Sequence, residues 1–265
     1  MKHDQMRRHI SQSGLLALGA LLVATRVLAE ASGPAKSASV EVPGSAEPRG
    51  SERPTKVIML LYPGTTMLDW IGPYELLHRV PGIELVLAAK TRDLYKSDSG
   101  MVSYQANALL QDIGKADVLL IPGGGMGVRD VSNDPDVMDW IKCIDQTSRI
   151  TASVCTGSLI LGRAGLLRGR RATTHWALQN MLNDQGATYT DERWVVSDKY
   201  WTSAGVSAGL DMTLALIGHL RGDTEAMKAQ LKIQYDPKPP YHAGSWSTAP
   251  EAIREAVGVP MPSHS

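Results

Sequence analysis

The sequence lacks phenylalanine, contains only two cysteines, and has no net charge because its 27 basic side chains balance its 27 acidic ones. Two cysteines are too few for a disulfide-stabilised exported scaffold. A neutral charge balance gives no electrostatic reason to expect nucleic acid or an anionic membrane surface as a partner. Without phenylalanine, the bulky apolar side chains of a core must come from Leu, Met, Trp and Tyr.

The first 54 residues are predicted to precede the folded domain. Arg7 and Arg8 come before an apolar segment, residues 14–25, which is too short for a membrane span and is followed by small residues suited to cleavage. We therefore predict an export signal over residues 1–29 and a flexible linker over 30–54, with a periplasmic or secreted product that keeps no stable membrane span after cleavage. The arginine pair fits the twin-arginine route, while a general secretory signal and an uncleaved anchor stay open.

The rest of the chain alternates short apolar runs with amphipathic segments. Continuous apolar runs at residues 56–62, 83–89, 117–121 and 150–154 are typical of strands buried on both faces of a parallel sheet. Helices are predicted over residues 68–80 (interrupted at Gly72 and Pro73), 135–147 (with Asp134 as N-cap), 175–185, 206–220 and from 223 to 235. This alternation predicts an α/β domain over residues 55–250 with a mostly parallel sheet, followed by a tail, 251–265.

The segment TASVCTGS, residues 151–158, is an apolar strand that ends in Cys155 and passes at once into a helix. Such a turn pushes the side chain out of the sheet, as at the nucleophile elbow of α/β hydrolases. The positive end of the helix predicts a lowered pKa for Cys155 and a nucleophile near neutral pH. A buried core cysteine is the alternative, and a disulfide with Cys143, which we expect in the core, also stays open.

Two further loops are expected at the same edge, where the carboxyl ends of parallel strands meet. One contains Gly123 and Gly124, whose bare backbone can turn N–H groups toward a bound anion or substrate. The other places Asp69 at a helix start, where its carboxyl group could hold or deliver a proton and where a neighbouring thiolate would raise its pKa. The glycines also fit a nucleotide loop, although the GxGxxG spacing is absent, and Asp69 also fits a plain helix cap.

Three motifs, LDxxGPxE at residues 68–75, IPGG at 121–124 and SVCTGS at 153–158, resemble the ThiJ/PfpI superfamily. That superfamily has a flavodoxin-like fold, a three-layer sandwich related to class I glutamine amidotransferases. The runs CTGSL at 155–159, RATTHW at 171–176 and AGLD at 208–211, with the Pro-rich stretch from residue 234, more narrowly resemble the isocyanide hydratases. The resemblance covers roughly residues 56–250.

The resemblance implies a hydro-lyase that takes isocyanides, which are small electrophiles, to N-substituted formamides without a metal or an organic cofactor. In the hypothesised mechanism the Cys155 thiolate attacks the isocyanide carbon while Asp69 delivers a proton, and water activated by Asp69 resolves the thioimidate. The N–H groups of Thr156 and Gly124 would stabilise charge, and the Thr156 hydroxyl would orient Asp69 or the water. Homologous domains generally dimerise, so we expect a homodimer.

Several alternatives remain at this stage. Thr156 stands where peptidase-like members carry histidine, which disfavours amide hydrolysis, and His175 is a weaker candidate for the missing base. The segment 203–205 is less glycine-rich than in the hydratases, and an export signal is unusual for largely cytosolic enzymes. The competing class is an exported redox sensor or ligand-binding domain in which Cys155 is oxidised to a sulfinate. A regulator fused to a helix-turn-helix module is disfavoured by the leader and by the roughly thirty residues after the last predicted helix.

Overall fold

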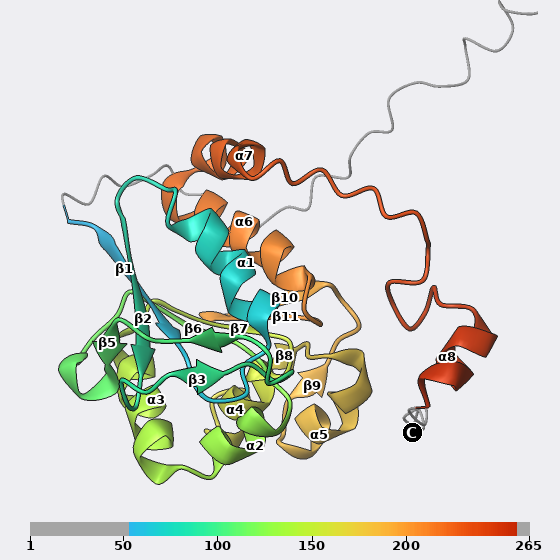
Figure 1. Ribbon diagram of the computed structural model, residues 1–265, viewed down its shortest axis with the longest axis horizontal. Helices are drawn as coiled ribbons and strands as arrows, with labels where there is room; N and C mark the ends of the chain where they lie inside the picture. The colour runs from blue at the N-terminus through green and yellow to red at the C-terminus, as the bar shows by residue number, and fades with distance from the viewer. Residues whose placement is uncertain (1–52, 259–265) are drawn as a thin grey trace, which may run out of the picture. The chain divides into compact units, whose positions relative to one another are not determined.

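The computed structural model describes residues 53–258, so the predicted export signal and most of the predicted linker lie outside the described residues. Seven strands form one sheet in the order β10-β11-β7-β6-β1-β2-β5, with helices on both faces (Figure 1). Every neighbouring pair in this sheet is parallel except β10 and β11, which form an antiparallel hairpin. The predicted α/β fold with a mostly parallel central sheet is confirmed.

The strands of the main sheet are β1 (Thr55–Leu60), β2 (Ile83–Ala89), β5 (Ala108–Leu109), β6 (Val118–Ile121), β7 (Ile150–Val154), β10 (Trp194–Ser197) and β11 (Tyr200–Ser203). Two small ladders pair β3 (Tyr95–Lys96) with β4 (Ser103–Tyr104) and β8 (Arg171–Ala172) with β9 (Thr188–Tyr189). The helices are α1 (Met67–Leu77), α2 (Met126–Ser132), α3 (Pro135–Thr147), α4 (Gly157–Arg163), α5 (Gln179–Asp184), α6 (Ala208–Arg221), α7 (Asp223–Lys232) and α8 (Glu251–Val257). Short 3-10 helices span Leu110–Asp112 and Trp176–Leu178.

The central strands are buried on both faces because alternate side chains enter two separate apolar clusters. In β1, Ile58 and Leu60 pack with α2 to α5, whereas Val57 and Met59 pack with α1, α6 and α7. Figure 1 shows the same division, with α1, α6 and α7 on one side of the sheet and α2, α3 and α4 on the other. The continuous apolar runs therefore correspond to strands between two helical layers.

The helix predicted to break at Gly72 and Pro73 is continuous. Pro73 lies inside α1, where it can only withhold one donor, the N–H that would bond the carbonyl of Asp69. Gly72 packs against α6, and a Cβ atom there would lie 3.2 Å from Leu210 Cδ2. The helix continues through Pro73 and packs closely on α6, so Asp69 lies in the first turn of an intact helix.

Cys143 was expected in the core, and this prediction is wrong. Its side chain is exposed, and both cysteines are free thiols. Helix α3 buries the face that carries Val137, Ile141 and Ile144. At about 100° per residue, Cys143 projects roughly 120° away from that face. The tail also differs from expectation, since residues 251–257 form helix α8. No helix within residues 53–258 is long and apolar enough to cross a membrane.

Candidate active site

Cys155 lies directly after β7, in a backbone conformation with a φ of +56°. A positive φ is uncommon for residues other than glycine and marks the strained turn expected of a nucleophile elbow. The Cys155 N–H donates to the carbonyls of Ser203 and Ala204, each at 3.1 Å. The hydroxyls of Ser158 and Thr174 donate to the Cys155 carbonyl at 3.1 and 3.2 Å. Both backbone polar groups of Cys155 are therefore held in place.

Asp69 enters the same site from the first turn of α1, and its side chain is fully buried. Its Oδ2 accepts the backbone N–H of Gly123 at 3.0 Å. Its Oδ1 has no regular hydrogen-bond partner among residues 53–258. Burial raises the pKa of Asp69 to about 7, although the bonds from Gly123 and from the Cys155 thiol favour the ionised form. A buried carboxyl group with one free oxygen is suited to exchanging a proton with a bound molecule.

The predicted rise in the pKa of Asp69 is present, but its main cause is burial rather than a neighbouring thiolate. The prediction of a lowered pKa for Cys155 is contradicted. Burial, and then the Asp69 carboxylate, raise the pKa of the Cys155 thiol to about 12. The backbone N–H groups of Val206 and Thr156 donate to the sulfur and only partly oppose that rise. The resting nucleophile is thus a thiol whose acceptor for the proton is Asp69.

The structure brings Gly123, Gly124 and Thr156 to Cys155 and Asp69, but it assigns them other contacts than expected. The Gly124 N–H donates to the Thr156 hydroxyl oxygen at 3.0 Å, and that hydroxyl donates to the Gly124 carbonyl at 3.2 Å. The Gly124 N–H is therefore already engaged, and the Thr156 hydroxyl bonds to the glycine loop and also lies within hydrogen-bonding reach of the Cys155 sulfur. The N–H groups that face the sulfur are those of Thr156 and Val206.

Gly123 is required by space rather than by conformation. A Cβ atom at this position would lie 2.6 Å from Thr156 Oγ1 and 2.7 Å from Asp69 Oδ2. Both distances are far below ordinary van der Waals contact. Only a glycine lets the loop after β6 reach between these two side chains.

Two residues of the site were missed from the sequence. Tyr62 follows β1, and its buried hydroxyl donates to the Pro122 carbonyl at 2.7 Å. This bond holds the residue that precedes the glycine loop. Burial, and then the nearby Asp69, hold the pKa of Tyr62 well above its usual value, so the phenol stays a donor. Val206, with a φ of +25°, presents its N–H to the sulfur. A tyrosine at the end of an apolar run could have been noticed, whereas nothing in the pattern points to the backbone of Val206.

His175 makes no hydrogen bond with Cys155 or Asp69 in the described part of the chain. Its Nδ1 accepts the backbone N–H of Ala177 at 3.3 Å, which caps the short helix Trp176–Leu178. Burial lowers the pKa of His175, so the ring is neutral. The described residues 53–258 contain no group of three or more His, Cys, Asp or Glu side chains that could hold a metal ion.

Residues 55–219 match the DJ-1/PfpI family. The chain is 38% identical to the isonitrile hydratase of Pseudomonas putida over 194 residues, which cover 73% of this chain and 84% of that enzyme. It is 29% identical to the HTH-type transcriptional regulator CdhR of Pseudomonas aeruginosa over 64% of this chain, but it spans only 52% of that regulator. Among solved structures, a ThiJ/PfpI family protein from Pseudomonas syringae superposes with a TM-score of 0.75 at 35% identity, covering 87% of this chain and 93% of that one.

Proposed function

The chain belongs to the DJ-1/PfpI family, and from this premise we propose that it hydrates isocyanides to N-substituted formamides. The resemblance to an isonitrile hydratase over most of both chains supports a hydratase-like function. The observation that carries the finer proposal is the buried pairing of the Cys155 thiol with a carboxyl group whose pKa is about 7. This pair can take a proton from sulfur and return it to a substrate without any other group.

The first step adds the thiol across the terminal carbon of R–N≡C. The ionised Asp69 accepts the proton of Cys155 and passes it to that carbon, while the sulfur lone pair forms the S–C bond. The product is the thioimidate R–N=CH–S–Cys155, and Asp69 is again ionised. The N–H groups of Thr156 and Val206 stabilise the negative charge that develops on the sulfur before the bond is complete.

The second step uses one water molecule. Asp69 accepts a proton from the water as its oxygen bonds to the thioimidate carbon, and this proton passes to the nitrogen to give R–NH–CH(OH)–S–Cys155. The C–S bond then breaks with its electron pair on the sulfur, and the hydroxyl proton returns through Asp69 to form the thiol. The released product is R–NH–CHO, so the sum is one isocyanide and one water for one formamide.

The alternative of a thiol-based redox sensor is less well supported. Oxidation to a sulfenic or sulfinic acid proceeds from a thiolate that is exposed to solvent. Cys155 is 5% exposed, and its pKa of about 12 keeps the thiol protonated. The same protonated state suits the addition step, which needs both the sulfur and its proton.

The proposal is tested with purified protein and phenyl isocyanide, with N-phenylformamide followed by chromatography. The wild type should turn over, Cys155→Ala should not, and Asp69→Asn should lose about two to four orders of magnitude in kcat/KM. Cys143→Ala is the matched control because it removes the other, exposed thiol and should leave the rate unchanged. Retained activity in Cys155→Ala would overturn the covalent mechanism, and no turnover by the wild type would overturn the function.

We also propose that the protein is exported and acts as a homodimer. Export is supported by the basic, apolar and small residues of the first 29 positions, and the dimer by the family to which the chain belongs. N-terminal sequencing of protein from the producing cells should place the mature end near residue 30. Light scattering should give twice the mass of one mature chain. An intact first methionine or a monomer mass would contradict the respective proposal.

A further inference from the structure

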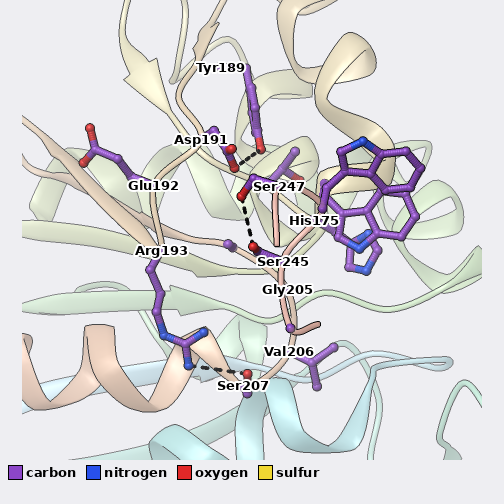
Figure 2. Close-up of a pocket in the computed structure, with 15 residues that line it drawn as sticks. His175, Tyr189, Asp191, Glu192, Arg193, Gly205, Val206, Ser207, Ser245 and Ser247 are labelled. Atoms are coloured by element: carbon purple, nitrogen blue, oxygen red, sulfur yellow. Dashed lines mark hydrogen bonds between the residues drawn. The ribbon is translucent and has the colours of Figure 1, made fainter. Parts of the chain in front are cut away.

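A pocket of about 480 Å³ is lined in part by residues that contact Cys155, and it has no role in the steps above. We call it the tail pocket; its lining comes from residues 174–176, 189, 191–193, 204–207 and 244–247 (Figure 2). Two of its walls touch Cys155 directly, since the Thr174 hydroxyl donates to the Cys155 carbonyl and the Val206 N–H donates to the sulfur. Cys155 and Asp69 do not themselves line the pocket, so only a substrate that reaches past Thr174 or Val206 would place one end at the sulfur.

One wall of the tail pocket is a row of aromatic rings. The rings of His175 and Trp176 have centroids 5.2 Å apart, and those of Trp176 and Trp246 are 4.5 Å apart. Trp246 lies in the segment between α7 and α8, far from the catalytic loops in sequence. Its indole N–H is buried without a hydrogen-bond partner among the described residues. The two indole rings are tilted by 33° to each other, and adjacent indoles with an unused donor are suited to a flat organic group that carries an acceptor.

The rim of the pocket carries an excess of negative charge. Arg193 is paired with Asp211, and Glu192 is paired with Arg171. Asp191 has no cation within ion-pair distance among residues 53–258, and its carboxylate accepts only the Tyr189 hydroxyl at 3.2 Å. Figure 2 shows Asp191 and Tyr189 on the same side of the pocket. His175 on the aromatic wall is neutral, while the Arg254 guanidinium lies 5.9 Å from the Trp246 ring centroid without lining the pocket. The rim should favour a cationic substituent over an anionic one.

We propose that the tail pocket binds the organic group of the substrate and selects a flat aromatic group, with a preference for a positively charged substituent at its outer end. This inference rests on the proposed function, because it assigns the R group of R–N≡C to the space beside Cys155. The isocyanide carbon would lie at the sulfur and the aromatic ring against the indoles. A substituent on the far side of the ring would then reach the rim near Asp191.

The test compares kcat/KM for four substrates: methyl, phenyl, 4-(aminomethyl)phenyl and 4-carboxyphenyl isocyanide. For the wild type, phenyl should exceed methyl, and the aminomethyl compound should exceed the carboxylate. Trp246→Ala should lower the phenyl-to-methyl ratio about tenfold, which is the loss of one aromatic stacking contact. Asp191→Asn should lower the preference for the aminomethyl compound over the carboxylate about threefold, as expected for one exposed charge.

Tyr241→Ala is the matched control, because this exposed aromatic residue lies in the same segment between α7 and α8 but does not line the pocket. It should leave both ratios unchanged. If Trp246→Ala and Asp191→Asn also leave them unchanged while the isocyanides are still hydrated, the pocket proposal is overturned and the proposed function stands. If none of the four compounds is hydrated by the wild type, the proposed function fails and this inference fails with it.

Discussion

Replacing Asp69 by asparagine should stabilise the fold at alkaline pH even though it removes activity. The Asp69 side chain is fully buried, and this burial is the largest cause of its pKa of about 7. Asparagine keeps an oxygen that can accept the Gly123 N–H, but it cannot ionise. The variant therefore separates the cost of a buried charge from the loss of the hydrogen bond.

The magnitude follows from the two pKa values of this carboxyl group. Asp69 releases its proton near pH 3.8 in the unfolded chain but keeps it to about pH 7 in the folded protein. The stabilising contribution of the protonated Asp69 carboxyl group is fully present below pH 3.8. It falls as the pH rises between these two values and is lost above about pH 7. The shift of about 3 pKa units corresponds to about 4 kcal/mol over the whole range. Asparagine should escape this decline.

Urea unfolding of both proteins at pH 5 and pH 8.5 measures the effect. Between these two pH values, the stability of Asp69→Asn relative to the wild type should rise by about 3 kcal/mol, because most of the proton release lies in this interval. Comparing the two proteins cancels the contributions that other titrating groups make to the pH dependence of stability. Asp117, whose pKa is lowered by Arg53, is one such group. If the two proteins change in parallel with pH, the argument that burial holds a proton on Asp69 is refuted.

Three further predictions follow from contacts of single residues. Gly123→Ala should lower kcat/KM at least a hundredfold through overlap with the catalytic side chains, whereas Gly125→Ala, which has open space around its Cβ position, should keep full activity in the same assay. Asp134→Ala should destabilise the protein by about 1 kcal/mol in urea unfolding, since its carboxylate caps helix α3. In a thiol titration of the folded protein Cys143 should react at once and Cys155 far more slowly; equally fast reaction of both thiols would contradict the buried, protonated state of Cys155.

Several elements could be predicted from the sequence because they depend on neighbouring residues. The apolar run 83–89 is strand β2 with the same bounds, and the predicted pair Asp134 and Pro135 starts helix α3. The strand before Cys155 ends where expected, at Val154. Helical spacing also places Cys143 on the outer face of α3, and this position decides its exposure more than the usual burial of cysteine does. Strand runs, caps and helix faces are local, so local patterns suffice for them.

The sequence by itself determined the alternation of the main strands and helices, although not helices α2 and α8, and it indicated that Cys155, Asp69 and the glycine loop meet at one sheet edge. Only the tertiary structure decided the protonation of that site. Burial by segments that are distant in the sequence raises the pKa of Cys155. The folded chain also brings Thr156 to the glycine loop, where its hydroxyl accepts the Gly124 N–H. The tail pocket likewise exists only where Trp246 meets Trp176. Desolvation and long-range contacts depend on the packed arrangement of the whole domain, and no local pattern of residues encodes them.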